Sequence, residues 1–132
     1  MNTAYLDTMK EVKNKYKVSL EEGEKVVFTG KMAGLSTDED GFLGADSFLT
    51  ITNKRILADT GAGVWIVDIA EDAVDMYYST IGKFLSKQEF IQVDLNKEMT
   101  YGIGIQKLHA YRYHLNKRDR QTVAEIARHM KE

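Results

Sequence analysis

The side chains best suited to acid–base or nucleophilic chemistry in this chain are its three histidines, His109, His114 and His129. His109 and His114 stand five residues apart, a spacing that places them on different faces of either a helix or a strand. The chain has no His-Glu-x-x-His pair, no nucleophile elbow and no phosphate-binding glycine loop. Gly102-Ile103-Gly104 lacks the third glycine of a dinucleotide fingerprint and lies in an alternating, strand-like run. These patterns favour neither catalysis nor nucleotide binding.

Carboxylates and thiols add little to this chemistry. Glu71, Asp72 and Asp75 stand close enough in sequence for an acid–base pair, but such a group is more typical of a hydrated surface turn. The chain has no cysteine, which excludes disulfides, thiol catalysis and thiolate metal sites and fits a reducing compartment. The sequence therefore predicts a protein that is not an enzyme and has no cofactor.

The acidic segment around residue 40 has part of the spacing of a calcium-binding loop. Ser36, Asp38, Asp40 and Gly41 take relative positions 1, 3, 5 and 6 of an EF-hand. Position 12 is Ser47, however, where an EF-hand needs a bidentate glutamate, and the flanking segments look like strands. We interpret the segment as a solvated acidic turn and expect no metal site, while cation binding by this loop is left open.

Charge is unevenly distributed, although the net charge of the 132-residue chain is only −2. Acidic residues dominate between positions 38 and 75, and basic residues dominate from position 107 onward. A basic end can attract an anionic partner such as membrane lipid, but a solvated basic helix is the simpler interpretation. The candidate anion or partner surface consists of Lys107, Arg112, Lys117, Arg118 and Arg120.

Tyr101, Tyr111 and Tyr113 lie near this basic region, and their rings could stack on single-stranded nucleic acid. The pI of about 5.9 is low for a nucleic-acid-binding protein of this size. We therefore assign these rings, and Trp65, to the core or to the seat of the last helix. No nucleic-acid partner is expected.

Hydrophobic periodicity predicts one domain built from a helix, about seven strands and a second helix. An amphipathic helix is expected over residues 3–17, and a final helix from Lys117 to Met130 with Asn116 or Asp119 as its N-cap. Residues 107–115 suit either a helix or a strand. The strands are expected at 26–32, 48–52, 55–59, 64–69, 73–81, 90–95 and 99–105, with a loop at 33–45 and a hairpin loop at 96–98.

The chain divides into an N-terminal amphipathic helix, residues 1–18, and a β-rich domain, residues 19–132. The apolar face of the helix must dock either on the domain's own core or on a neighbouring subunit. The N-terminus lacks the basic and apolar regions of a signal peptide, and no window approaches the ~20 apolar residues of a membrane span. We expect a soluble, cytoplasmic protein.

Two short motifs carry a family resemblance. Gly23-Glu24-Lys25-Val26-Val27-Phe28-Thr29-Gly30 precedes Leu49–Leu57, in which Thr52, Asn53, Lys54 and Arg55 form the polar turn of a hairpin. Asparagine tolerates the positive φ that such turns often need. The pair of motifs resembles "GEKVLFTG" and "LTNKRL" of bacterial pleckstrin-homology-like (PH-like) and GRAM domains, in the same order and at a similar distance.

The resemblance implies a mainly β fold, a bent antiparallel barrel of about seven strands capped by a C-terminal helix. The N-terminal helix would be an addition to it. A lipocalin-like or other small β-barrel is the alternative. Eukaryotic PH domains that bind phosphoinositides use basic residues around the first hairpin loop. This chain has only Lys31 there, beside an acidic loop, so that activity is not carried over.

Two functional hypotheses follow, because this fold is a scaffold for many kinds of binding. The first is a protein-interaction module that acts through a sheet edge, through the groove beside the C-terminal helix or by self-association as a homo-oligomer. The alternative is peripheral binding to anionic membrane lipid through the basic C-terminal end. We favour the first hypothesis. The sequence identifies neither the partner nor the biological process, and it leaves the oligomeric state open.

Overall fold

Seven strands and a few helices follow one another in the computed structural model, which describes residues 1–102, 104 and 106–131. The strands are β1 (Val26–Thr37), β2 (Phe42–Thr52), β3 (Arg55–Asp59), β4 (Val64–Asp68), β5 (Ala73–Ile81), β6 (Gln88–Tyr101) and β7 (Gln106–Leu115). The helices are α1 (Ala4–Thr8), α2 (Ile69–Asp72), the 3₁₀ turn η1 (Phe84–Ser86) and α3 (Lys117–Met130).

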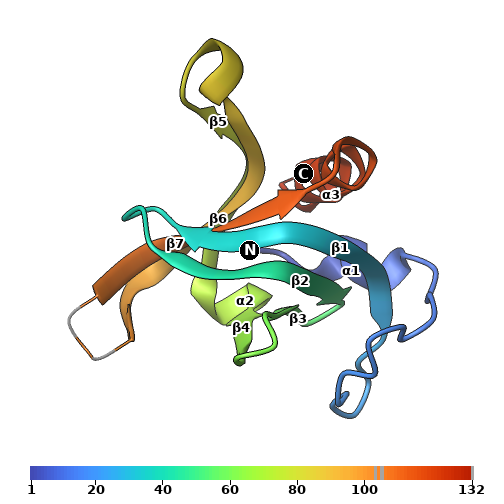
Figure 1. Cartoon of the computed structure of the whole chain (residues 1–132). Coiled ribbons are helices and arrows are strands. Elements are labelled where there is room, and N and C mark those ends of the chain that lie inside the picture. The colour runs from blue at the N-terminus through green and yellow to red at the C-terminus, as the bar shows by residue number, and fades with distance from the viewer. Residues whose placement is uncertain (103, 105, 132) are drawn as a thin grey trace.

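The strands form one antiparallel sheet in the order β4-β3-β2-β1-β7-β6-β5, so β4 and β5 are its two edges. Figure 1 shows the sheet curling around its inner face, with α3 beside one end. Register shifts in β1, between Met32 and Gly34 and between Leu35 and Ser36, let the sheet bend. The predicted fold class, a bent antiparallel barrel of about seven strands with a C-terminal helix and an extra N-terminal helix, is confirmed.

The hydrophobic core lies on the inner face of the curled sheet. In β6, Ile91, Val93 and Leu95 are buried and alternate with half-buried polar residues, as predicted for this segment. Tyr111 and Tyr113 of β7 are also buried in the core. Their rings are therefore not available to stack on nucleic-acid bases.

The C-terminal helix α3 has the predicted bounds and the predicted buried face. Its N-cap is Asn116, whose side-chain oxygen accepts a hydrogen bond from the backbone N–H of Asp119 at 2.9 Å. This bond satisfies one of the backbone donors that every helix leaves free at its start. The buried residues that close the core include Val123, Ile126, Ala127 and Met130.

We expect Asn116→Ala to lower the free energy of unfolding by about 1 kcal/mol, because alanine cannot accept the bond from Asp119. Urea unfolding of the variant and the wild type measures the difference. Asn116→Ser, which keeps an acceptor at the N-cap, is the control and should stay within about 0.5 kcal/mol of the wild type. An alanine variant as stable as the serine variant would contradict the capping role.

The predicted N-terminal helix over residues 3–17 is wrong in length, because α1 ends at Thr8. The helix docks on the domain's own core, where Leu6 is fully buried. Tyr5 stacks on His129 of α3, with ring centroids 4.5 Å apart. Of the two predicted docking places, own core and neighbouring subunit, the structure therefore supports the first.

Beyond α1 the chain runs without a helix along the start of β1. The N–H of Val12 donates to the carbonyl of Val26 at 2.9 Å, and the N–H of Val18 donates to the side chain of Asn14 at 3.0 Å. Short helices are marginal in water unless tertiary packing supports them. In this segment a bond to β1 and a local side-chain bond take the place of helical hydrogen bonds.

The predicted hairpin loop at 96–98 is also wrong, because β6 continues through it to Tyr101. Asp94 pairs with Ala110 and Met99 pairs with Leu108, so residues 95–98 of β6 lie opposite the single residue His109. The polar run is therefore a large bulge.

The hairpin turn follows Tyr101, and Ile103 and Ile105 of the predicted strand 99–105 lie outside the described residues. The ambiguous segment 107–115 belongs to strand β7.

Two smaller predictions also need correction. The loop predicted at 33–45 is only a turn at 38–41, since β1 and β2 extend into it. The buried strand predicted at 64–69 is the edge strand β4, in which Val64 and Ile66 are 51% and 44% exposed. Trp65 between them is half-buried and packs against the core.

Candidate functional site

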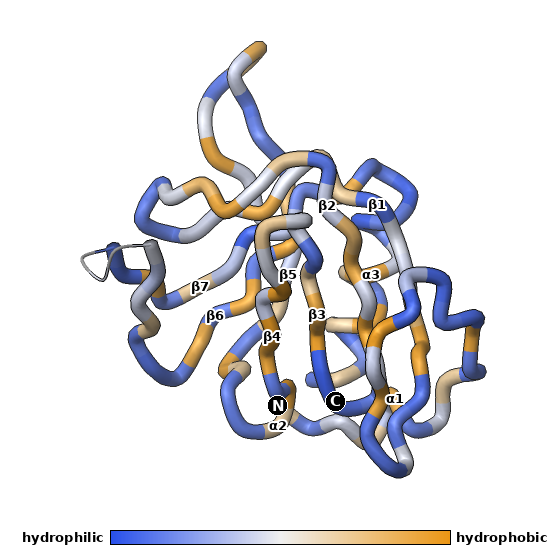
Figure 2. Tube along the Cα trace, turned by 60° about the horizontal axis from the view of Figure 1, so that its bottom comes forward, coloured by the Kyte–Doolittle hydropathy of each residue, from blue (hydrophilic) through white to orange (hydrophobic). Residues whose placement is uncertain are grey.

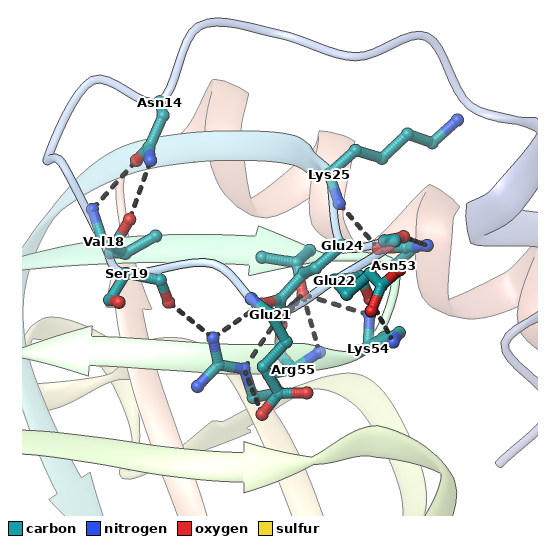
Figure 3. Close-up of polar contacts among 12 residues, drawn as sticks. Asn14, Val18, Ser19, Glu21, Glu22, Glu24, Lys25, Asn53, Lys54 and Arg55 are labelled. Carbon is teal, nitrogen blue, oxygen red and sulfur yellow. Dashed lines mark hydrogen bonds and ion pairs between the residues drawn. The ribbon is translucent and has the colours of Figure 1, made fainter.

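The two sequence motifs meet in space and form a polar network, which we call the clasp (Glu24, Thr52, Asn53 and Arg55). The carboxylate of Glu24 is fully buried and accepts hydrogen bonds from the Arg55 guanidinium at 2.6 and 2.8 Å and from the Thr52 hydroxyl at 2.6 Å. Figure 3 shows Arg55 reaching from β3 toward the segment before β1. The clasp therefore joins the start of β1 to the β2–β3 turn.

Asn53 completes the clasp with both ends of its amide. Its Oδ1 accepts from the N–H of Lys25 at 2.9 Å, and its Nδ2 donates to the carbonyl of Gly23 at 3.2 Å and to the carboxylate of Asp7 at 2.9 Å. The φ angle of Asn53 is not positive, so the turn does not use the conformational tolerance expected of asparagine. Asn53 is buried, and its amide group forms hydrogen bonds that join the turn to the N-terminal segment.

The remaining motif contacts hold the N-terminal segment in place. The Lys54 ammonium donates to the carbonyl of Glu22 at 2.9 Å, and the Arg55 guanidinium donates to the carbonyl of Ser19 at 2.8 Å. The four motif residues thus make structural contacts. Sequence reasoning missed Glu24 as their central partner, although it stands in the first motif between a glycine and an apolar strand.

Electrostatics of the clasp favour the ionised pair. Burial by itself raises the pKa of Glu24, but hydrogen bonds from Arg55, Thr52 and the backbone N–H of Glu21 outweigh it and lower the pKa to about 2. The hydrogen bond to Glu24 in turn raises the pKa of Arg55. The carboxylate is thus held as an anion, and it has no free lone pair for proton transfer chemistry.

An apolar groove begins where the clasp ends. This β4 groove encloses about 300 Å³, and Arg55 and Ser19 are among its lining residues. The ring of Tyr16 packs on that of Phe48 with centroids 4.7 Å apart. Its apolar lining residues are Tyr16, Val18, Phe48, Leu57, Val64 and Ile66.

The sheet register explains how these apolar residues come together. On the outer face, Leu57 of β3 lies opposite Ile66 of β4, and Val64 lies opposite Asp59. Side chains directly opposite in an antiparallel pair share a face. The outer face of β2, β3 and β4 therefore carries an apolar band that reaches the edge of the sheet, and no sequence pattern within one strand could predict it.

A second groove lies between α3 and the β5–β6 hairpin, with a volume of about 500 Å³. Its lining is largely charged, and most of these charges already have partners. Glu89 accepts from the Tyr78 hydroxyl at 2.5 Å and from the Arg120 guanidinium at 3.2 Å. This is the helix-side groove that the resemblance suggests for peptide docking, but Tyr78 and Ala124 are its only apolar or aromatic lining residues among those described, whereas the β4 groove has six.

The five predicted basic residues do not form one surface. Lys107 lies at the start of β7, where its ammonium pairs with Glu98 at 3.3 Å. Lys117 lies ten residues later at the start of α3, roughly 30 Å away along the strand direction. Lys117 and Arg120 both line the helix-side groove, whereas Lys107 does not.

Two of the five residues are occupied inside the fold. Arg112 donates to Gln92 at 3.0 Å and lies 5.0 Å from the centre of the Phe90 ring. Arg120 donates to the carbonyl of Leu115 at 3.2 Å in addition to Glu89. Arg118 is exposed, with Asp119 at 3.7 Å. Only Lys117 and Arg118 are therefore well exposed at the helix start.

The acidic segment does not form the loop that an EF-hand requires, because its residues divide between β1, a short turn and β2. The Ser36 hydroxyl bonds the His114 ring at 2.7 Å. Asp38 Oδ1 accepts from the N–H groups of His109 and Ala110 at 2.8 and 2.9 Å, so this carboxylate ties the turn to β7.

A cluster that the sequence did not suggest lies beside this turn. His109 Nδ1 stands 3.6 Å from Asp38 and 3.7 Å from Glu39, and its Nε2 stands 3.2 Å from Glu98. Asp38, Glu39 and His109 place ligand atoms within 4.8 Å of one another and form, among the described residues, a group that could hold a metal ion. The sequence separation of Asp38 from His109 is 71 residues, so no local motif could reveal the cluster.

The other candidates for acid–base chemistry lie apart from one another. Burial and, secondarily, the charge of Arg112 lower the pKa of His114. Asp72 pairs with Lys97 at 3.1 Å, and Asp75 pairs with Lys131 at 2.9 Å. These carboxylates are held by lysines in separate ion pairs, and the prediction that the protein is not an enzyme stays a prediction.

The fold defines a mainly β protein, a curled seven-stranded antiparallel half-barrel with a C-terminal helix. Comparisons with protein-family models, with curated proteins and with solved structures return no match. Membership of the PH-like family therefore stays a prediction. Within the described part of the chain, no helix has both the length and the apolar character needed to cross a membrane.

Proposed function

We propose that this protein is a non-enzymatic binding module that takes up an extended segment of a partner protein along strand β4. The observation that carries the proposal is the exposure of Val64 and Ile66 on an edge strand beside an apolar groove. Edge strands offer unpaired backbone N–H and C=O groups, to which an extended peptide can add as a further strand. The resemblance to PH-like domains, a family of binding scaffolds, also supports this proposal.

The β4 edge has few of the features that usually protect a sheet edge. Soluble proteins commonly place lysine, proline, a bulge or an inward charge on such strands. The run Val64-Trp65-Ile66-Val67 has no charge, and a charged residue follows only at Asp68. A bound strand with apolar side chains at alternate positions would place them beside Val64 and Ile66 and next to the groove.

The test uses a display library of random peptides selected against the whole protein. We expect enriched peptides to share apolar residues at alternate positions and to shift the backbone amide resonances of residues 64–68. Val64→Lys should weaken their binding at least tenfold, because a charge on the edge opposes strand addition. Val74→Lys makes the same change at an exposed valine on the other edge strand and should leave binding unchanged.

Two results would contradict this proposal. One is a library that yields no peptide, and the other is a set of peptides that bind the Val64→Lys variant as tightly as the wild type. Concentration-dependent self-association that Val64→Lys abolishes would instead identify a second copy of the chain as the partner, through antiparallel pairing of two β4 edges.

The second candidate function is binding to an anionic membrane. The sequence supports this function by a basic surface of five residues. The structure weakens that support, because Lys107 lies far from Lys117 and because Arg112 and Arg120 bond to other residues of the fold. A different feature of the structure favours it, namely the exposed end of the β5–β6 hairpin.

A further inference from the structure

The β5–β6 hairpin extends beyond the rest of the sheet. Its strands pair with each other as far as Ile81 and Gln88, whereas the pairing of β6 with β7 begins only at Ile91. Figure 1 shows this hairpin rising away from the body of the domain. Its end, which we call the tip (residues 83–87), contains the 3₁₀ turn η1.

The tip carries two large apolar side chains in full contact with solvent. Phe84 is 94% exposed and Leu85 is 105% exposed, more than any other large apolar residue among those described. Figure 2 shows the end of the hairpin in the colour of hydrophobic residues, at the point farthest from the core. Folding buries neither side chain, so a contribution to the stability of the domain does not explain why apolar residues occupy these two positions.

The backbone at the tip adds to this unusual placement. Phe84 has φ +55°, a left-handed conformation that costs a bulky residue about 1 kcal/mol and that glycine adopts freely. An aromatic side chain is thus held out into solvent at a position where glycine would be less strained. Strain of this kind is a feature of sites that contact ligands.

Positive charge surrounds the apolar pair. Lys83 directly precedes it, Lys87 follows after Ser86, and no acidic residue occurs between Ile81 and Gln88. Lys87 has Glu89 at 3.9 Å, a distance at which an exposed pair interacts weakly. Lys117, at the exposed start of α3, lines the groove at the base of the same hairpin.

We propose that the tip is a membrane-insertion device, in which Phe84 and Leu85 enter the apolar boundary of an anionic lipid bilayer while Lys83 and Lys87 contact its headgroups. Two apolar side chains on a projecting turn are a small contact, far below the roughly 800 Å² per partner of a specific protein interface. A bilayer needs no surface of complementary shape, so two apolar side chains on a projecting turn can insert into it. The lysines favour anionic headgroups over neutral ones.

This inference is independent of the proposed peptide site, because β4 and the tip of the β5–β6 hairpin belong to opposite edges of the sheet. The two surfaces make separate predictions. Variants of one surface therefore serve as controls for the other.

The experiment is co-sedimentation of the whole protein with vesicles of phosphatidylcholine alone or mixed with phosphatidylglycerol. We expect binding to the mixed vesicles at low salt and much weaker binding to the neutral ones. The double variant Phe84→Ser/Leu85→Ser should bind at least tenfold more weakly, since both apolar side chains are lost. Val64→Ser/Ile66→Ser removes a less exposed apolar pair from β4, on the opposite edge of the sheet, and should bind like the wild type.

The charge and the depth of insertion are tested separately. Lys83→Gln/Lys87→Gln should reduce binding about fivefold per lysine and remove most of its salt dependence. Phe84→Trp places an indole at the tip, and its emission should shift to shorter wavelength and be quenched by brominated lipid, with wild-type emission from Trp65 subtracted.

Failure of the wild type to bind the mixed vesicles at low salt would overturn the proposal and indicate that the tip contacts a protein partner instead. Equal binding by the Phe84→Ser/Leu85→Ser variant, or loss of binding by the β4 variant alone, would also overturn it. Because Phe84 and Leu85 are exposed, the serine variants should fold, and their urea unfolding curves confirm this for each preparation.

Discussion

Replacing Glu24 with glutamine is expected to lower the free energy of unfolding by about 3 kcal/mol at pH 7. Glutamine has the shape of glutamate but no charge, so the partly buried guanidinium of Arg55 loses its buried counter-ion and keeps only the more distant, exposed Glu21 at 3.9 Å as an ion-pair partner among the described residues. Breaking a buried ion pair by removing one partner is strongly destabilising, because the remaining charge stays in a poorly solvated place. Urea unfolding of both proteins measures the difference.

The pH dependence of that difference follows from the pKa of Glu24. Folding lowers this pKa from its usual value of 4.5 to about 2, so the folded state favours the ionised carboxylate. The stabilisation is complete well above pH 4.5 and is lost as the pH falls toward 2. The difference between wild type and Glu24→Gln should therefore shrink to roughly half or less near pH 3.

The matched control is Glu22→Gln, the same change at an exposed neighbour, which should alter stability by less than about 0.5 kcal/mol. A double variant Glu24→Leu/Arg55→Met should be more stable than the sum of its single changes predicts, because neither side chain then leaves an unpaired charge. A Glu24→Gln variant whose deficit does not change between pH 7 and pH 3 would contradict the electrostatic explanation.

The second large effect is expected at the N-terminus, where Leu6→Ala should cost about 3 kcal/mol of unfolding free energy. Leu6 is the one buried residue of α1 and is fully enclosed in the domain's core. Truncation removes its packing and leaves a cavity that the surrounding strands fill only in part. The ammonium group of Met1, which donates to the carbonyls of Ile69 and Ala73, is expected to lose its position as α1 loosens.

Leu20→Ala is the control for this change. It removes the same atoms from the same N-terminal segment, but Leu20 is 38% exposed, so its loss should cost less than about 1 kcal/mol. Gel filtration provides a second readout. Because α1 packs on its own domain, Leu6→Ala should lower stability without changing the oligomeric state of the folded protein. A change from dimer to monomer at unchanged stability would contradict this packing and indicate that α1 joins two subunits.

Local patterns in the sequence were sufficient for several elements. The helix Lys117–Met130 was predicted with its N-cap and its buried face, because a period of 3.6 and a capping side chain act within one segment. The hairpin at Thr52–Arg55 was predicted for a similar reason, since a polar pair between two apolar runs specifies a tight turn. The number of strands was also right, although two predicted strands proved to be one and an ambiguous segment supplied the seventh.

Elements that depend on distant partners were not predictable in this way. The segment after Thr8 has helical periodicity, yet its backbone bonds to Val26. The polar run at 96–98 resembles a turn, yet it forms a bulge, because α2 and β7 provide partners for Asn96, Lys97 and Glu98. In both places a contact between segments outweighs a local preference of a few tenths of a kcal/mol per residue.

The candidate sites show the same division. The sequence by itself determined the composition of the two motifs and the lack of cysteine. Only the tertiary structure decided that Glu24 would be buried against Arg55, that Val64 and Ile66 would face solvent and that Phe84 and Leu85 would project from the domain. Burial is a property of the whole chain, because it depends on which strands cover one another, and no segment specifies its own neighbours.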